Sequence, residues 1–151
     1  SNFILGFPGE MKADVAELER FLVAARLDAV GLFGYSDEDG TEAATFDRKV
    51  RRDTIERRLS RITALAEELV AQRAEERLGE TVEVLVESVG EDELVEGRAA
   101  HQAPETDGTT TVRGAGEVQV GDLVRCVVDG SDGVDLHATA VDALTAAAIA
   151  G

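Results

Sequence analysis

The spacing of apolar residues changes near Gly79, and this change constrains the fold more than any other feature of the sequence. Before Gly79, apolar residues recur every three or four positions, as on one face of a helix. After it, Val82, Val84 and Val86 recur at every second position, as in a strand with one buried face. A chain of 151 residues has room for one ordinary domain or two small ones. We therefore predict an α/β unit over residues 1–77, followed by an all-β unit.

The first unit alternates strand and helix patterns. Residues 3–7 are an almost fully apolar run, typical of a strand that is buried on both faces. Residues 10–26 carry one apolar stripe at helical spacing, and residues 29–35 form a second apolar run. Strand, helix and strand with short connections make a βαβ unit, so we expect the two strands to be parallel.

The predicted sheet is too small to stand alone. Apolar parallel strands need neighbours on both sides and helices on both faces, and an uncovered apolar edge promotes aggregation. The chain also begins with Ser1 rather than Met and enters its first strand within two residues. We therefore expect residues 1–77 to be the last part of a larger α/β barrel, a partial barrel of the TIM type, whose earlier strands are absent. The alternative is that this half packs on itself and on the second unit.

A second helix is predicted over residues 53–77, because Asp53 and Glu56 have the spacing of a capping box and an apolar stripe follows them. Seven of the chain's 15 basic residues stand at or near the start of this helix: Arg48, Lys49, Arg51, Arg52, Arg57, Arg58 and Arg61. They form either a solvated helix face or a contact with an acidic partner, such as the second half of the same chain.

The second unit contains five short runs of strand composition, at residues 82–86, 94–99, 109–112, 123–128 and 134–140. Glycine-rich turn signals separate these runs. Five short strands in about sixty residues predict a small antiparallel barrel of the oligonucleotide-binding kind over residues 78–142. The Ala-rich segment 143–151 is expected to be a short helix or a frayed end.

Charge is distributed unevenly between the two units. The chain has 31 acidic and 15 basic residues, a formal net charge of −16. Residues 78–151 hold 15 acids and only 3 bases, a net charge of −12, and contain no Phe, Tyr or Trp. A nucleic-acid partner needs clustered bases, and single strands also need aromatic stacking platforms. We therefore expect the second unit to bind a basic or neutral partner and not nucleic acid.

The few cysteines and histidines limit the chemistry of the chain itself. Cys126 is the only cysteine, which excludes a disulfide framework and an all-cysteine metal site within this chain. Its apolar neighbours indicate a core residue rather than a reactive thiol. His101 and His137 are far apart in sequence and are predicted to be structural or surface residues. No apolar run is long enough to span a membrane and no secretory signal opens the chain, so we expect no membrane partner and a cytoplasmic location.

Three segments in order resemble the radical S-adenosylmethionine methylthiotransferases. Residues 2–10, NFILGFPGE, are similar to the GFPGE strand and turn of that family, and residues 35–43, YSDEDGTEA, to its later YSxxxGTxA segment. Residues 79–140 resemble the TRAM domain that ends these enzymes. Within them, residues 97–108, GRAAHQAPETDG, are closest to the branch that modifies ribosomal protein twelve of the small subunit.

The resemblance implies an enzyme that inserts a methylthio group at the β-carbon of an aspartate in that basic ribosomal protein. In the family, a three-cysteine loop holds a 4Fe–4S cluster that cleaves S-adenosylmethionine to a radical, and a second iron–sulfur cluster handles sulfur delivery. None of those cysteines is present here. The chain would therefore be the carboxy-terminal part of such an enzyme, inactive by itself, in which the cofactors perform the chemistry and this protein binds and orients.

Five residues are implied to lie beside the S-adenosylmethionine site. Gly6, Gly9 and Glu10 stand at the carboxyl end of a predicted barrel strand, where barrel active sites form. Tyr35 and Ser36 end the next strand at the same rim. The alternatives are a plain tight turn for the first three residues and a core-edge role for the tyrosine. No pair of residues requires a catalytic acid or base, and none is assigned.

A loop in the second unit is the candidate for recognition of the substrate protein. It contains Pro104, Glu105, Asp107 and Gly108, and its two carboxylates could pair with Lys or Arg of a basic ribosomal protein. The alternative is a turn in which these residues serve geometry only. Two other functions stay open from the sequence: a transfer-RNA methylthiotransferase, which the net charge of −12 opposes, and a non-catalytic adaptor built on a TRAM module.

Overall fold

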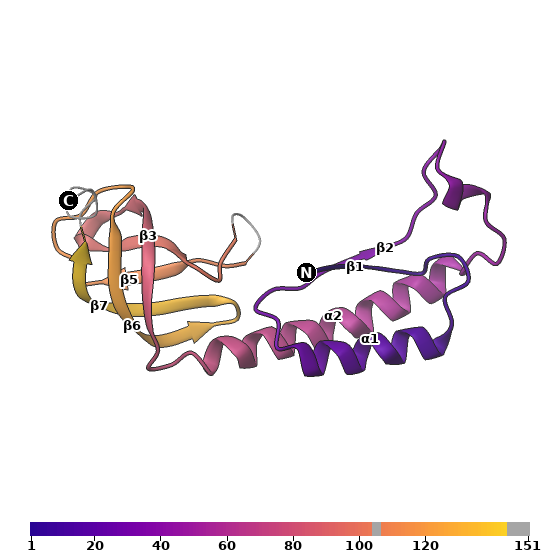
Figure 1. Ribbon diagram of the computed structural model, residues 1–151, viewed down its shortest axis with the longest axis horizontal. Helices are drawn as coiled ribbons and strands as arrows, with labels where there is room; N and C mark the ends of the chain where they lie inside the picture. The colour runs from indigo at the N-terminus through magenta and orange to yellow at the C-terminus, as the bar shows by residue number, and fades with distance from the viewer. Residues whose placement is uncertain (104–106, 145–151) are drawn as a thin grey trace. The chain divides into compact units, whose positions relative to one another are not determined.

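The computed structural model describes residues 1–103 and 107–144, and the chain divides into two compact units, residues 1–70 and 71–151 (Figure 1). The first unit contains β1 (Asn2–Leu5), α1 (Lys12–Ala25), β2 (Gly31–Gly34), the short 3-10 helix η1 (Glu42–Thr45) and most of α2 (Arg52–Glu75). The second contains β3 (Thr81–Val89), the 3-10 turn η2 (Glu91–Glu93), β4 (Val95–Ala99), β5 (Thr110–Arg113), β6 (Leu123–Asp132) and β7 (Asp135–Leu144).

The predicted βαβ unit is confirmed. β1 and β2 pair in parallel, with Asn2 opposite Gly31 and Leu5 opposite Gly34. Both long helices lie on the same side of this strand pair (Figure 1). Their apolar stripes meet one face of the sheet in a core that contains Leu5, Val15, Leu22 and Ile62.

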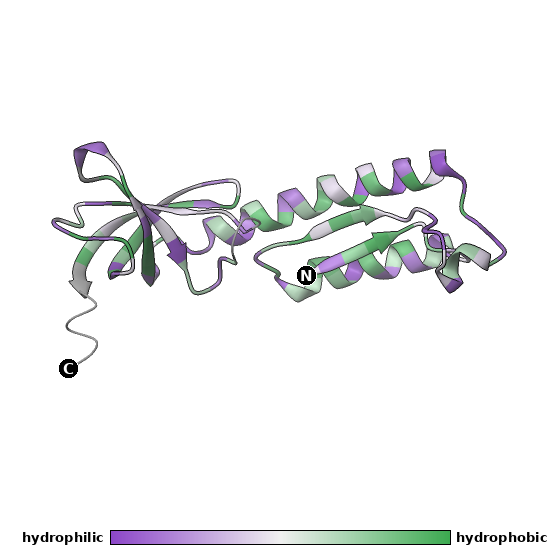
Figure 2. Cartoon of the chain, turned by 90° about the horizontal axis from the view of Figure 1, so that it is seen from above, coloured by the Kyte–Doolittle hydropathy of each residue, from purple (hydrophilic) through white to green (hydrophobic). Residues whose placement is uncertain are grey.

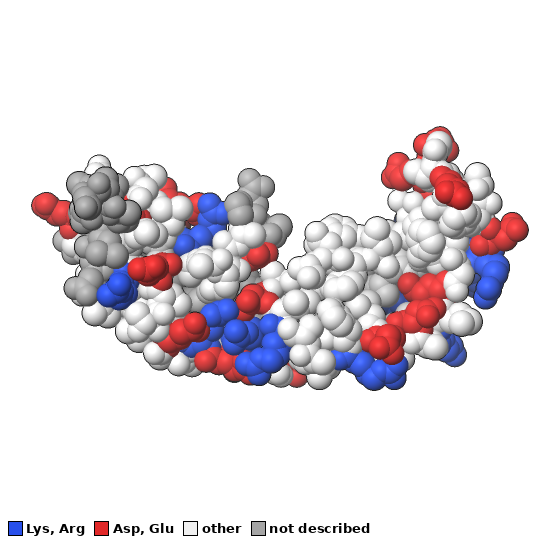
Figure 3. All heavy atoms as spheres, in the orientation of Figure 1, with Lys and Arg blue, Asp and Glu red and all other residues white. Residues whose placement is uncertain are grey.

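The opposite face of the two-stranded sheet is not covered. The prediction that residues 3–7 are buried on both faces is wrong for the described residues, because Ile4 is 61% exposed while Leu5 is buried. On β2, Phe33 is 56% exposed as well. Figure 2 shows both strands as largely hydrophobic, and in Figure 3 the surface above them carries no charged groups. An apolar patch of this kind is typical of a surface that contacts further protein.

The second unit is a closed five-stranded barrel with the strand order β3-β4-β5-β7-β6. Inward-facing valines fill it, and Val84, Val95, Val112 and Val124 are fully buried. The predicted oligonucleotide-binding kind of barrel is confirmed, but it is mixed rather than antiparallel, because β5 and β7 pair in parallel. The reason is geometric: strands in a closed ring can alternate direction throughout only if their number is even, so a ring of five must contain a parallel pair.

The boundaries of most elements lie a few residues from the predicted ones, and two of these differences change an interpretation. α2 begins at Arg52, so Asp53 lies inside the first turn and pairs with Arg51 instead of capping the helix. The capping interaction occurs at α1, where the Asp14 carboxylate accepts a hydrogen bond from the Met11 N–H at 2.7 Å. β7 continues to Leu144 because it pairs with β6 over its whole length. The first two residues of the expected tail are therefore strand, and the rest of it lies outside the described residues.

Candidate functional site

The two motif segments, residues 2–10 and 35–43, meet at one end of the parallel strand pair. The carboxyl ends of parallel strands lie at the same edge of a sheet, where α/β proteins bind ligands. The Tyr35 N–H donates a hydrogen bond of 2.7 Å to the Leu5 carbonyl, which extends the pairing beyond the strands. The Phe7 ring then packs edge-to-face against the Tyr35 ring, with 5.4 Å between centroids. The structure therefore brings together the turn after β1 and the segment after β2, as predicted.

The turn after β1 depends on its glycines for two different reasons. Gly6 has φ +85°, and a Cβ at that position would lie 2.3 Å from Cγ1 of Ile55 on α2. Gly9 has φ +90° but open space around it. Its N–H donates a hydrogen bond of 3.0 Å to the Arg48 carbonyl. Gly6 thus supplies both a left-handed conformation and room for the helix, whereas Gly9 supplies only the conformation.

Both oxygens of the Glu10 carboxylate bind groups of this chain. One oxygen accepts the Gly6 N–H at 2.7 Å, and the other pairs with the Arg58 guanidinium at 2.6 Å. The two side chains are only 11% and 15% exposed. Glu10 therefore fixes the turn to α2 and is a positioning residue. Sequence reasoning missed Arg58 as its partner, since the partner comes from a helix 48 residues further along the chain.

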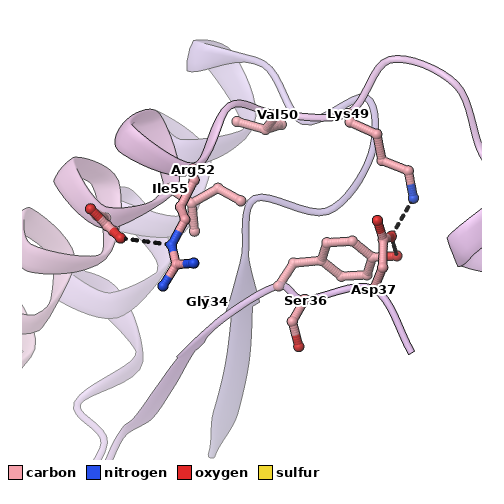
Figure 4. A pocket seen from close by; sticks show the side chains of 9 residues that line it. Gly34, Ser36, Asp37, Lys49, Val50, Arg52 and Ile55 are labelled. Atoms are coloured by element: carbon pink, nitrogen blue, oxygen red, sulfur yellow. Dashed lines mark hydrogen bonds and ion pairs between the residues drawn. The ribbon is translucent and has the colours of Figure 1, made fainter. Parts of the chain in front are cut away.

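A pocket of about 430 Å³ opens beside this edge (Figure 4). Gly34, Tyr35, Ser36 and Asp37 line it from the end of β2, and Lys49, Val50, Arg52, Ile55 and Glu56 line it from α2 and the segment before it. Of the five residues predicted to lie beside a cofactor, Tyr35 and Ser36 line this pocket. Gly6, Gly9 and Glu10 form the adjoining turn and do not line it.

Tyr35, Asp37 and Lys49 form a small polar network on the pocket wall. The Tyr35 hydroxyl donates a hydrogen bond of 2.8 Å to Oδ1 of Asp37, and Lys49 forms an ion pair with the same oxygen. Nζ of Lys49 also donates to the Ala43 carbonyl at 2.8 Å and lies 5.4 Å from the centre of the Tyr35 ring. The sequence analysis did not single out Asp37. It named Lys49 only as one of the seven basic residues near the start of α2, and it did not predict that the two residues would pair.

The contacts within this network move the pKa of each of the three side chains further from pH 7. The hydrogen bond from Lys49 is the main cause that lowers the pKa of Asp37, and the same contact raises the pKa of Lys49. Loss of solvation around the ring, followed by the hydrogen bond to Asp37, raises the pKa of Tyr35. At neutral pH the carboxylate is therefore anionic, the amine cationic and the phenol neutral. An efficient proton-transfer group needs a pKa near the working pH, so the network is suited to orientation rather than acid–base catalysis.

Comparison with known proteins identifies relatives of this chain. A TRAM domain model matches residues 78–141. A protein of Streptomyces avermitilis named "Ribosomal protein uS12 methylthiotransferase RimO" is 62% identical over 138 residues, which is 91% of this chain and 28% of that protein. A protein of the same name from Salinispora arenicola is 60% identical over 154 residues, 97% of this chain and 30% of the relative. This chain is homologous to a part of the proteins named as uS12 methylthiotransferases. It spans less than a third of the length of these relatives.

The TRAM domain contains the predicted recognition loop. Pro104 and Glu105 lie outside the described residues. The Asp107 carboxylate accepts the Ala103 N–H at 3.0 Å, and a Cβ at Gly108 would lie 2.7 Å from the Val134 carbonyl oxygen. Both residues therefore shape the loop, as the alternative interpretation holds, and a recognition role stays a prediction.

One buried residue beside this loop was missed by sequence reasoning. Oε1 of Gln102 accepts hydrogen bonds from the Ala99 N–H at 3.0 Å and the Thr110 hydroxyl at 2.7 Å. The side chain is buried, and its Nε2 has no hydrogen-bond partner among the residues that the structure describes. Gln102 thus anchors the start of the loop to β4 and β5.

The described residues do not fit an iron–sulfur cluster. Among residues 1–103 and 107–144, no group of three His, Cys, Asp or Glu side chains could hold a metal ion. Cys126 lies inside the barrel, where burial raises its pKa to about 11. A thiol must be deprotonated to ligate iron, so this cysteine is suited to the core and not to a cluster. None of the helices in the described ranges is long and apolar enough to cross a membrane.

Proposed function

We propose that this chain is part of an enzyme that adds a methylthio group to the β-carbon of an aspartate in small-subunit ribosomal protein twelve. The observation that carries the proposal is the identity of about 60% over more than nine-tenths of the chain with proteins named for modifying uS12. The activity belongs to the longer protein, because this chain supplies no cluster ligands. We expect the isolated chain to be inactive, and the enzyme to work in the cytoplasm, where ribosomal proteins are made.

The first unit is proposed to complete the α/β barrel of the enzyme and one rim of its S-adenosylmethionine site. The uncovered face around Ile4 and Phe33 supports a continuation of the sheet and its cover in the longer protein. Tyr35 and Ser36 would contact the cofactor, while Gly6, Gly9 and Glu10 shape the adjoining turn. When bound at the 4Fe–4S cluster of the parent enzyme, S-adenosylmethionine would supply the radical chemistry. The residues of this chain would hold and orient it.

The barrel is proposed to capture the substrate protein. Its net charge of −12 favours a basic polypeptide and repels nucleic acid. Loop residues Pro104, Glu105, Asp107 and Gly108 remain the proposed recognition segment, at which carboxylates would pair with basic side chains of the ribosomal protein. The alternative of a transfer-RNA substrate is not favoured, because the relatives are named for uS12.

The activity is tested with the full-length enzyme that contains this chain. We expect mass spectrometry to find one added methylthio group on an aspartate of ribosomal protein twelve, and none on transfer RNA, after incubation with S-adenosylmethionine, a sulfur source and a reductant. Modification of transfer RNA instead would contradict the proposal. Capture is tested separately by titrating the 151-residue chain with ribosomal protein twelve over a salt series. Glu105→Lys with Asp107→Lys should weaken binding, and unchanged affinity would remove the loop from recognition.

A further inference from the structure

A second groove lies between α1 and α2, and none of its residues lines the pocket beside Tyr35. Its volume is about 440 Å³, and the charged residues that line it are Lys12 and Glu19 from α1 and Arg57, Arg58 and Arg61 from α2. Four cations thus face one anion within a chain whose net charge is −16. The groove therefore has the opposite sign from the protein as a whole.

Two of these cations are neutralised and two are not. Arg58 pairs with the partly buried Glu10, and Arg61 pairs with Glu19 at 2.7 Å. Lys12 and Arg57 are both exposed and form neither a hydrogen bond nor an ion pair with the residues that the structure describes. They approach the groove from different helices. Two unpaired like charges on one groove repel each other, and an anion placed between them relieves that repulsion.

We propose that this groove binds phosphate groups of an RNA backbone. A guanidinium and an ammonium on opposite walls suit a phosphate, since the first binds two oxygens at once and the second acts as a point charge. No aromatic residue lines the groove, so it has no platform on which a base could stack. Exposed cations without a stacking platform contact the backbone of a polymer without reading its sequence.

The inference deepens the proposed function and rests on it. A ribosomal protein is bound to ribosomal RNA once the small subunit assembles, so RNA phosphates would lie close to the modified aspartate. The anionic barrel would contact the protein, and the groove on the first unit would contact the RNA. The sequence-based expectation that nucleic acid is not a partner then holds for the barrel alone. The substrate favoured by this arrangement is the RNA-bound form of the ribosomal protein.

The test compares three forms of the 151-residue chain, the unaltered chain, Lys12→Ala with Arg57→Ala, and Arg20→Ala as a matched control. Arg20 is an exposed base of α1 that pairs with Glu17 and does not line the groove. The probe is a fluorescent oligouridylate, with inorganic phosphate and a phosphoserine peptide as competitors. We expect the double variant to bind RNA about tenfold more weakly, and its salt slope to fall by about 1.4 for two lost phosphate contacts. The control should bind as the unaltered chain does, and inorganic phosphate should compete with RNA.

Equal RNA affinity in the double variant and the unaltered chain would overturn the proposal. Tighter binding of the phosphoserine peptide than of RNA would also overturn it and would assign the groove to a phosphoprotein. Circular dichroism melting of each variant establishes that the fold is kept. A negative result for RNA binding at the groove can be distinguished from failure of the proposed function. The unaltered full-length enzyme is assayed separately for modification of free ribosomal protein twelve.

Discussion

The two units of this chain differ in how their sheets end. In the barrel every strand pairs with two others, whereas β1 and β2 each have a single neighbour. Val95 in the barrel is fully buried, but Ile4 in β1 is 61% exposed although it is the larger and more apolar side chain. All six aromatic residues belong to the first 46 residues. Among the described residues, the hydrophobic cluster of the barrel contains aliphatic side chains and Cys126. The comparison teaches that sheet closure, and not apolar content, decides which side chains are buried.

The largest effect is expected from placing a charge inside the closed barrel. Val84 is fully buried, so Val84→Asp leaves a carboxylate without a partner and should cost roughly 3–5 kcal/mol of unfolding free energy. Cys126 in the same core is a convenient reporter, because its thiol should react with a maleimide only when the barrel opens. Glu83→Gln on the exposed face of the same strand is the control and should change stability by less than about 0.5 kcal/mol. Thiol labelling as slow in Val84→Asp as in the unaltered chain would show that the buried carboxylate does not open the barrel, which would contradict the prediction.

The next effect separates a largely shielded ion pair in the first unit from an exposed one on the barrel. Arg58→Ala leaves the partly buried Glu10 without its cation and should lower stability by about 2–3 kcal/mol, measured by urea unfolding. Arg125→Ala removes a pair with Glu83 at 3.7 Å in which both side chains are about half exposed. That change should cost about 0.5 kcal/mol or less. Equal costs for the two variants would refute the positioning role assigned to Glu10.

Glycine substitutions in the turn after β1 should differ in size. Gly6→Ala meets both a left-handed φ and a contact of 2.3 Å with Ile55, so we expect a loss of about 2–3 kcal/mol. Gly9→Ala meets only the unfavourable φ and should cost about 1 kcal/mol. Combining Gly6→Ala with Ile55→Ala should cost less than the sum of the two single changes, because Ile55→Ala removes Cγ1, Cδ1 and Cγ2, the three atoms that a Cβ at Gly6 would meet. Strict additivity would show that the contact is not the cause.

The smallest effect concerns two carboxylates whose pKa values are lowered, one in each unit. Asp37 is shifted mainly by its hydrogen bond with Lys49, and Asp129 on β6 mainly by its hydrogen bond with the Thr139 hydroxyl. A depressed carboxyl pKa stabilises the fold above the unfolded value of 3.8, and that contribution is lost as the pH falls through the folded value. NMR titration should place both below 3.8. Lys49→Gln should raise the pKa of Asp37, and Thr139→Val that of Asp129. Added salt should move Asp37 further than Asp129, since its main partner is a charge.

The sequence by itself determined the local and repetitive features of this protein. The change of apolar spacing near Gly79 marks the transition from α2 to the strands of the barrel. The order of strands and helix predicts a parallel β1–β2 pair, and alternating valines predict the barrel. These features depend on residues close together in the chain, where spacing reports directly which face is buried. The motifs at Gly6 and Tyr35 were found for the same reason, because both are continuous segments.

Only the tertiary structure decided which distant residues meet. It paired Glu10 with Arg58, placed Ile55 against Gly6, and put Lys12 and Arg57 on one groove. It also left Ile4 exposed, although the apolar run around it predicts burial on both faces. Spacing along a helix shows that a residue shares a face with others, but not which neighbouring element that face contacts. That information depends on the rotation and offset of one element against another, which are set by the packing of the whole unit.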